Sequence, residues 1–137
     1  MQVQPYLFFD GRCEEAIEFY QKTLGAEVVF LMRFKDSPET HSPEIAALNT
    51  DEKVMHATLK IGETTVMVSD GRNTGLPVFQ GFSLSLDAEN VAEAEKLFDA
   101  LAIGGQVHMP LAKTFFSPMF GMVADQFGVP WMINTRS

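Results

Sequence analysis

The sequence predicts a single α+β domain, residues 1–137, built from two βαβββ modules that form curved mixed sheets with helices on their outer faces. The order strand, helix, strand, strand, strand occurs twice, with a repeat of roughly 75–80 residues, which suits two copies of one unit better than a solenoid. The first strand of each copy ends in an aspartate, Asp10 and Asp87. One helix cannot cover its own short sheet, so the copies, about 1–77 and about 78–137, are expected to pack together.

The first module begins with a strand over residues 3–9, which Pro5 places towards a sheet edge. A helix follows, because apolar side chains recur at i, i+3, i+4, i+7 and i+11. They are Cys13, Ala16, Ile17, Tyr20 and Leu24. Gly25 is predicted to end this helix as its C-cap.

Three more strands complete the first module. The first covers residues 26–34 and is followed by a polar loop, 36–52, that contains Pro38 and Pro43. Residues 54–61 and 64–69 alternate and flank Gly62-Glu63, which predicts a tight hairpin. Residues 70–77 are predicted to form the loop that leads into the second module.

The second module repeats this order. Residues 82–86 form its first strand, and Asn90 with Glu93 predicts a capping box for its helix. The apolar face of that helix consists of Val91, Ala94, Phe98 and Leu101. Gly104-Gly105 ends the helix, and residues 106–111, 119–124 and 129–135 are the three further strands.

Composition narrows the class of function. The formal net charge is −8, from 18 acidic against 10 basic side chains. Such a chain repels phosphate backbones and anionic lipid surfaces, so neither nucleic acid nor a membrane is an expected partner. No apolar run reaches the roughly 18–20 residues of a membrane helix. One cysteine permits no internal disulfide. We expect a cytoplasmic protein.

Several segments, distributed over nearly the whole chain and in the same order, resemble those of one protein family. They are PYLFFDG, AIEFYQKTLGAEV, MHATLKIG, VMVSD, GFSLSLD, TFF and DQFGVPWMIN. The chain resembles the PhnB-like branch of the vicinal oxygen chelate superfamily, which includes glyoxalase I, extradiol dioxygenases and bleomycin- and fosfomycin-resistance proteins. The resemblance implies paired βαβββ modules and a homodimer. Members of this branch often carry a methyltransferase label, but the sequence has no glycine-rich turn between a parallel strand and a helix.

The resemblance also implies where metal ligands would stand. Metal-using members bind one divalent ion through His, Gln and Glu on the first and last strands of each module. Here the first position falls on Gln4, which can still coordinate a metal, and the others fall near Met67, at Gly81 or Phe82, and at Met132. A thioether is a poor ligand for a hard metal. We therefore expect no full metal site and no other cofactor.

For the last strand, the sequence predicts which side chains share a face, and a structure can test this prediction. Met132 and Asn134 share one strand face and are expected to point into the cavity between the sheets. Trp131 and Ile133 should pack on the opposite, helix-covered face, where the indole N–H needs a partner. The alternative for Asn134 is a frayed strand end in water.

His56 is the candidate for acid–base chemistry, because imidazole titrates near neutral pH. Strand alternation places it on one face with Thr58 and Lys60; a purely structural hydrogen bond is the alternative. The expected ligand-binding side chains are Gln4, Tyr6, Met67, Phe116, Met132 and Asn134. Asp70 is expected to anchor the loop that follows it. Cys13 is expected to be a buried, inert thiol, and His41 and His108 to be solvated.

Two classes of function remain open at this point. In the first, the protein binds a small, partly apolar molecule in the sheet cavity without a full metal site, with or without acid–base chemistry by His56. In the second, it is a metal-dependent lyase, isomerase or dioxygenase that recruits Gln4, His56 and Asp70 as ligands. An accessory role in phosphonate metabolism rests on family naming alone.

Overall fold

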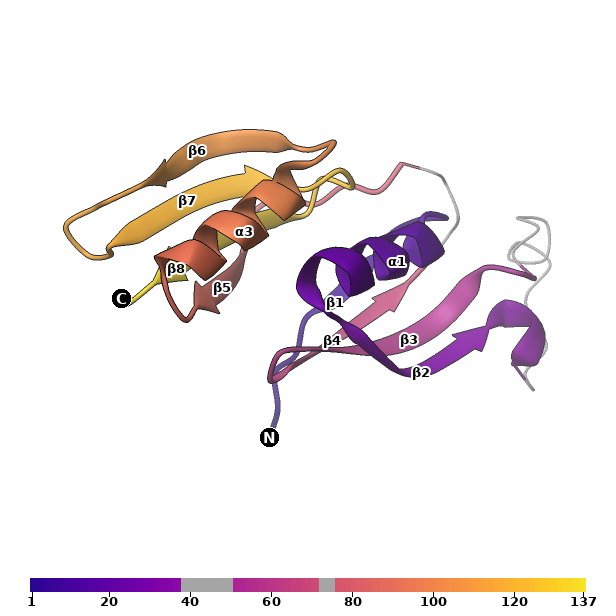
Figure 1. Ribbon diagram of the computed structural model, residues 1–137. Coiled ribbons are helices and arrows are strands. Elements are labelled where there is room, and N and C mark those ends of the chain that lie inside the picture. Colours follow the sequence, from indigo (N-terminus) through magenta and orange to yellow (C-terminus); the bar gives the residue numbers. More distant parts are fainter. Residues whose placement is uncertain (38–50, 72–75) are drawn as a thin grey trace. The chain divides into compact units, whose positions relative to one another are not determined.

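The computed structural model describes residues 1–37, 51–71 and 76–137. These residues form two compact units, Met1–Pro77 and Val78–Ser137, hereafter unit 1 and unit 2 (Figure 1). The predicted loop around His41, Pro38 and Pro43 lies outside the described residues.

Unit 1 contains a mixed four-stranded sheet and one α-helix. Its elements are β1 (Tyr6–Phe8), α1 (Cys13–Leu24), β2 (Glu27–Arg33), the short 3₁₀ helix η1 (Phe34–Asp36), β3 (Val54–Ile61) and β4 (Thr64–Ser69). The strand order is β1-β4-β3-β2. β1 runs parallel to β4, whereas β4, β3 and β2 pair antiparallel. The hairpin of β3 and β4 has the predicted bounds.

Unit 2 repeats this topology. Its elements are β5 (Leu84–Ala88), α3 (Val91–Ala102), β6 (Gln106–Ala112), β7 (Met119–Ala124) and β8 (Pro130–Thr135), with the strand order β5-β8-β7-β6. β5 runs parallel to β8. The predicted α+β class, with two βαβββ-like modules and a helix on each sheet, is therefore confirmed.

The first strand of each unit differs from its predicted bounds. β1 is shorter than the expected strand 3–9, and β5 starts two residues later than the expected strand 82–86 and ends two residues later. Within the part of the chain that the structure describes, each is an edge strand with one neighbour, so its extent follows that neighbour. β1 pairs with Met67–Ser69 of β4, and β5 pairs with residues 131–135 of β8.

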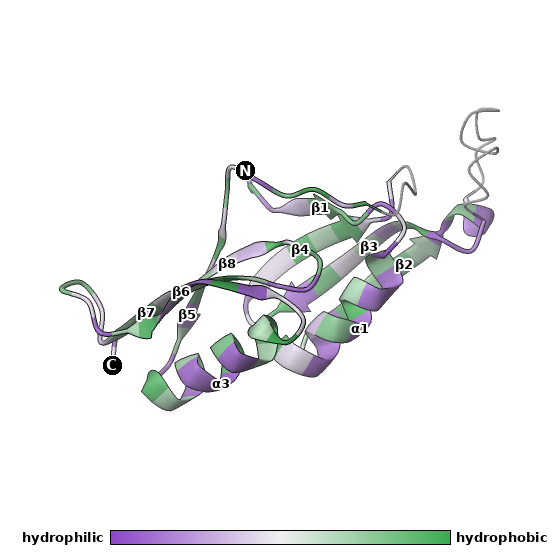
Figure 2. Ribbon diagram, turned by 90° about the horizontal axis from the view of Figure 1, so that it is seen from above, coloured by the Kyte–Doolittle hydropathy of each residue, from purple (hydrophilic) through white to green (hydrophobic). Residues whose placement is uncertain are grey.

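Each helix lies against the sheet of its own unit (Figure 1). Figure 2 shows hydrophobic and hydrophilic residues alternating along both helices, as an amphipathic helix requires. The buried residues are Cys13, Ala16, Ile17 and Tyr20 in α1 and Ala94, Phe98 and Leu101 in α3. Leu24 and Val91 are only partly buried, because they occupy helix ends.

The helix ends agree with the sequence signals, with one correction. Gly25 ends α1 at φ 66°, a left-handed conformation that glycine adopts without steric cost. Asn90 Oδ1 accepts the Glu93 backbone N–H at 2.8 Å, as predicted. The Glu93 carboxylate, however, accepts from the backbone N–H of Glu89 and not from that of the capping Asn90. The capping box is therefore half formed.

Close packing in unit 2 depends on Gly121 of β7. A Cβ atom at this position would lie 2.8 Å from Phe98 Cε2 of α3. Gly121 pairs with Ile133 of β8, which is fully buried. The helix-facing side of this sheet therefore includes Ile133, and the alternate residues of β8 face away from the helix.

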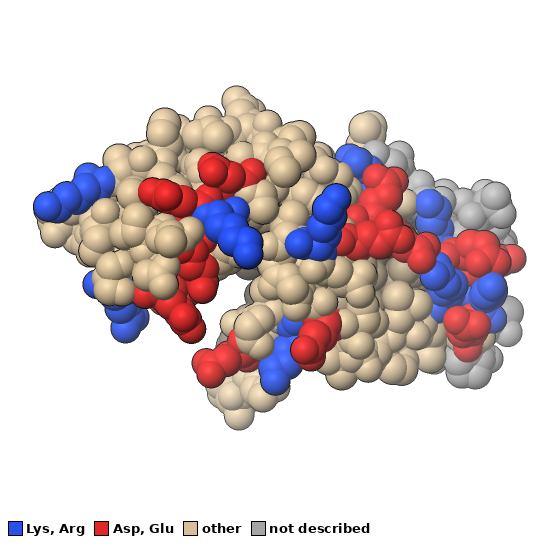
Figure 3. Space-filling model, viewed as in Figure 1, with Lys and Arg blue, Asp and Glu red and all other residues tan. Residues whose placement is uncertain are grey.

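Among the described residues, no helix is long and apolar enough to cross a membrane. On the face that Figure 3 shows, Lys and Arg side chains lie among Asp and Glu and form no continuous basic surface. This arrangement agrees with the acidic balance of the sequence.

Candidate functional site

A chain of three hydrogen-bonded side chains lies on the sheet of unit 1. Tyr6 Oη is 2.8 Å from His56 Nδ1, and His56 Nε2 is 3.1 Å from Thr58 Oγ1. Tyr6 comes from β1, and His56 and Thr58 come from β3, two strands away in the order β1-β4-β3-β2. The structure thus brings together residues separated by 50 positions in the chain.

These three residues lie on the sheet face that α1 does not cover. Leu7, Ala57 and Leu59 are buried, and strand alternation turns Tyr6, His56 and Thr58 to the opposite side. Register adds further residues to this side, which we call the open face of unit 1. It consists of Tyr6, Phe8, Phe30, Met32, His56, Thr58 and Met67.

Aromatic rings surround the imidazole. The Tyr6 and Phe8 rings are stacked with centroids 5.0 Å apart, and the Tyr6 and His56 rings lie 5.5 Å apart. Phe30 lies 6.1 Å from His56 on its other side. Tyr6, Phe8 and Phe30 are 39%, 53% and 47% exposed. Exposed apolar side chains that gather around polar groups are typical of binding surfaces.

The hydrogen-bond chain can run in two directions. A neutral imidazole carries one N–H donor and one acceptor nitrogen. Either Tyr6 donates to Nδ1 and Nε2–H donates to Thr58, or Thr58 donates to Nε2 and Nδ1–H donates to Tyr6. Partial burial raises the pKa of Tyr6, so the phenol keeps its proton at neutral pH. The three side chains can therefore pass a proton along their hydrogen bonds while each of them stays neutral.

Two further predicted binding residues belong to unit 1. Met67 of β4 pairs with Tyr6 in the parallel ladder, so it lies on the open face beside the Tyr6–His56 pair. Gln4 lies before β1, and its side-chain amide donates to Gln2 Oε1 at 3.2 Å. Met67 therefore lies beside the Tyr6–His56 pair, whereas the Gln4 amide is hydrogen-bonded to Gln2.

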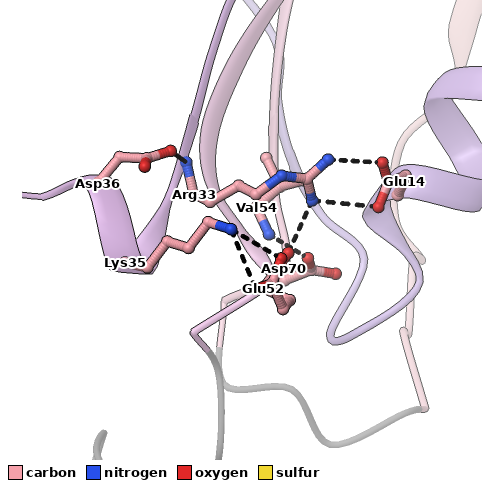
Figure 4. Close-up of polar contacts among 7 residues, drawn as sticks. All are labelled: Glu14, Arg33, Lys35, Asp36, Glu52, Val54 and Asp70. Carbon is pink, nitrogen blue, oxygen red and sulfur yellow. Dashed lines mark hydrogen bonds and ion pairs between the residues drawn. The ribbon is translucent and has the colours of Figure 1, made fainter.

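Asp70 follows β4 and is fully buried. Its Oδ1 accepts the backbone N–H of Cys13, the first residue of α1, at 2.8 Å, and its Oδ2 accepts the backbone N–H of Val54 at 2.7 Å. Figure 4 shows the second of these contacts. Both oxygens are engaged in joining β4, the start of β3 and the helix N-terminus. The predicted role of Asp70 in anchoring the following loop stays a prediction, because residues 72–75 lie outside the described part of the chain.

The Cys13 thiol is buried against this anchor. Burial raises its pKa strongly, and the nearby Asp70 carboxylate raises it further. A thiol that stays protonated is a weak nucleophile. His108 is exposed on the edge strand β6, as expected from the sequence.

In unit 2 the register of β8 is as predicted. Trp131 is 4% exposed and Ile133 is fully buried, whereas Met132 and Asn134 are partly buried on the other face. The indole Nε1 donates to the buried Asp125 at 3.0 Å, so the expected partner exists. Met132 pairs with Met122 of β7.

Asn134 is part of the strand and not a frayed end. Its Nδ2 donates to Asp87 Oδ1 at 3.1 Å across the β5–β8 pair. Its Oδ1 is buried and has no hydrogen-bond partner among the described residues. On the neighbouring strand it pairs with Phe120, whose ring lies 5.0 Å from that of Phe116. Phe116 is exposed, in the loop that precedes β7.

Comparisons with known proteins agree with this architecture. Residues 1–134 match the family model described as 3-demethylubiquinone-9 3-methyltransferase. The protein YjdN of Escherichia coli strain K12 is 40% identical over 141 residues, which cover 98% of this chain and 95% of the relative. The chain belongs to the PhnB-like family.

Two solved structures show how far the likeness extends. Protein PA1353 from Pseudomonas aeruginosa is 42% identical, with a TM-score of 0.85 and coverage of 99% of this chain and 98% of that one. A protein from Bacillus cereus, described as a putative 3-demethylubiquinone-9 3-methyltransferase and PhnB protein, is 28% identical, with a TM-score of 0.77 and coverage of 98% and 99%. The predicted membership of the PhnB-like branch is confirmed.

The positions where the resemblance implies metal ligands carry few side chains that suit a hard divalent ion. Among the described residues, no group of three His, Cys, Asp or Glu side chains is placed to hold an ion. Both oxygens of Asp70 already accept backbone N–H groups. Met67 and Met132 offer thioethers where the resemblance implies carboxylates. The alternative ligand set of Gln4, His56 and Asp70 stays a prediction.

Four residues of the open face are not singled out in the sequence analysis. Phe8, Phe30 and Met32 are absent from its candidates, and Thr58 enters it only as a neighbour of His56. Alternation within residues 3–9 already put Phe8 on the side of Tyr6. The place of Phe30 on this face is harder to predict from the sequence, because a bulge between Val28 and Phe30 shifts the register of β2.

Proposed function

We propose that this PhnB-like protein binds a small, partly apolar molecule on the open face of unit 1 and acts on it, or holds it, through His56 and Tyr6. The observation that supports this most directly is the 2.8 Å contact between Tyr6 Oη and His56 Nδ1 within a group of exposed aromatic rings. A titratable pair inside an apolar surface is the combination expected of a binding site.

The roles divide by chemistry. Phe8 and Phe30 supply flat apolar area, and Met67 supplies a thioether side chain that adapts to irregular shapes. His56 supplies an imidazole, the side chain that most often serves as a general acid or base. In unit 2, Phe116, Met132 and Asn134 are proposed as further ligand-binding residues, and Gln4 remains a proposal of the same kind.

Methyl transfer is not part of this proposal. The descriptions of the family model and of the Bacillus cereus protein both name a methyltransferase. Both sheets described here are mixed and four-stranded, and neither has the doubly wound parallel arrangement with a glycine-rich turn that cradles a nucleotide-like cofactor. The open face of unit 1 supports acid–base chemistry more directly.

A thermal-shift screen with aldehydes, thiols, quinones and phosphonates tests the proposal. A ligand at ~100 times its dissociation constant adds about 2.7 kcal/mol to the free energy of unfolding, which is a readily measured shift. The shift should disappear in Tyr6→Phe and His56→Gln, and it should persist in His108→Gln, which changes an exposed histidine of unit 2. A ligand that stabilises the natural protein and all three variants equally would contradict the proposed site.

The absence of a full metal site stays a prediction. Elemental analysis of protein purified without chelator decides it. We expect Ni, Zn, Mn and Fe well below one equivalent per chain. Near-stoichiometric content of any of them would favour the metal-dependent alternative, and Asp70→Asn and His56→Gln would then show whether those side chains hold the ion.

A further inference from the structure

We infer that the Tyr6–His56–Thr58 chain is a reversible hydrogen-bond relay that recognises the carbonyl oxygen of a planar, conjugated carbonyl compound, with Thr58 as the residue that permits the reversal. This inference rests on the proposed function and names the ligand class and the positioning residue for the same site.

The relay follows from the two contacts of the imidazole. Both ring nitrogens have a hydroxyl partner, at 2.8 Å and 3.1 Å, and each hydroxyl can donate or accept. In the free protein the phenol of Tyr6 is the stronger donor, because it is far more acidic than the Thr58 hydroxyl. We therefore expect Tyr6 to donate to Nδ1 and Nε2–H to donate to Thr58.

A ligand oxygen reverses this order. When a carbonyl accepts the Tyr6 O–H, the phenol no longer donates to Nδ1. The imidazole then carries its proton on Nδ1 and donates it to Tyr6 Oη, and Thr58 donates to Nε2. All three groups remain paired and neutral in both directions, so the reversal costs no buried charge. Without the Thr58 hydroxyl, Nε2 would lose its donor in the ligand-bound direction.

The ligand class follows from the surroundings of Tyr6. The Phe8 ring is stacked on Tyr6 at an interplanar angle of 26°, and both rings are substantially exposed. Such a surface favours a flat π-system lying against it. The polar group offered there is a neutral O–H, which suits the neutral oxygen of a carbonyl conjugated with that π-system.

Acetophenone and α-methylstyrene are matched probes for this idea, because they share shape and planarity but only acetophenone has a carbonyl. By NMR titration of the full chain, acetophenone should bind about three- to tenfold more tightly, the worth of one neutral hydrogen bond. Tyr6→Phe should remove the difference. Thr58→Val should reduce it, and Thr58→Ser, which keeps the hydroxyl, should restore it.

The ¹⁵N shifts of the His56 ring report the direction of the relay independently of affinity. We expect the ring proton to move from Nε2 to Nδ1 with acetophenone and to stay on Nε2 with α-methylstyrene. Acetophenone binding without this change would overturn the relay while leaving the proposed function intact. No acetophenone binding, with a different hit in the thermal-shift screen, would overturn the ligand class. No hit at all would count against the proposed function itself.

Discussion

Asp125 and Trp131 are joined by a buried hydrogen bond in which the indole Nε1 donates to carboxylate Oδ2 at 3.0 Å. The other carboxylate oxygen accepts the backbone N–H groups of Phe127 and Val129, at 2.9 and 3.1 Å. One side chain therefore closes the turn before β8 and fixes the indole at the helix-facing side of the sheet. The register of β8, and with it the side on which Met132 lies, depends on this arrangement.

Trp131→Ala should reduce the free energy of unfolding by roughly 3–5 kcal/mol, because it removes a large buried side chain and leaves a cavity. Urea denaturation followed by circular dichroism measures this loss. Trp131→Phe keeps most of the ring but leaves Asp125 Oδ2 without its indole donor, so its cost should be smaller, about 1–3 kcal/mol. Equal stability of the alanine variant and the natural protein would contradict the described packing.

Met132→Glu should fold with a smaller loss than Trp131→Ala, about 1–2 kcal/mol. Met132 is only partly buried and lies on the face away from α3, so a carboxylate there keeps access to water. Met132→Gln is the control that separates the change of shape from the added charge. Chemical denaturation of Met132→Glu, Met132→Gln and Trp131→Ala in parallel ranks their losses of stability. If Met132→Glu lost as much as Trp131→Ala, Met132 would lie in the helix-facing core.

The parts of the fold that the sequence predicted best are those decided by local pattern. The β3–β4 hairpin has its predicted bounds because its alternation and its Gly62-Glu63 turn are adjacent in the chain. The limits of β1 and β5 were less accurate, since an edge strand extends only as far as its partner. That partner is β4 or β8, which lies far away in the sequence.

In the candidate site, too, local pattern predicted some relations between residues, and long-range strand pairing set the others. Alternation placed His56 and Thr58 on one face, because they are two positions apart in the same strand. The contact between His56 and Tyr6 depends on the parallel pairing of β1 with β4, and no local signal sets that register. The two backbone contacts of Asp70 likewise connect positions 57 and 16 residues apart, so no local pattern in the sequence predicts them.

The Glu14–Arg33 pair should make stability depend on pH in the acid range. The guanidinium contacts both carboxylate oxygens, at 2.7 and 3.1 Å, and lowers the pKa of Glu14 (Figure 4). A depressed folded pKa contributes stability above the unfolded value, about 4.3, and this is lost as pH falls through the folded value. The Glu14 side chain is 55% exposed, so we expect only about 0.2–1 kcal/mol.

Glu14→Gln should remove this contribution, and the difference from the natural protein should shrink between pH 5 and the acid limit, roughly pH 2–3. Urea denaturation at a series of pH values, at low and at high salt, measures it. Glu15→Gln is the matched control, because it removes a neighbouring carboxylate of the same helix turn that pairs with Arg12 instead. If the difference in the free energy of unfolding between Glu14→Gln and the natural protein did not change with pH, the Glu14–Arg33 ion pair would not be a source of the pH dependence.

A homodimer is the expected assembly. Val28, Val29 and Phe30 of the edge strand β2 are 38%, 64% and 47% exposed, and an apolar strand edge of this kind favours association. Size-exclusion chromatography with light scattering at micromolar concentration measures the mass directly. A mass near the 15.2 kDa of one chain would contradict the dimer. Val29→Lys should shift the equilibrium towards that mass if β2 lies in the interface.

Asp70→Ala should destabilise the protein by about 2–5 kcal/mol without any direct effect on ligand chemistry. The substitution leaves two buried backbone N–H groups, those of Cys13 and Val54, without an acceptor, and each costs about 1–3 kcal/mol. Asp70→Asn retains one acceptor oxygen but turns an amide N–H₂ towards the other backbone donor, so its cost should be of similar size. Asp99→Asn, at an exposed position of α3, is the control and should stay within about 0.5 kcal/mol of the natural protein.

If Asp70→Ala were as stable as that control, the buried carboxylate would not be the anchor of α1. If it kept full stability but lost binding of a screened ligand, Asp70 would belong to the site and not to the scaffold.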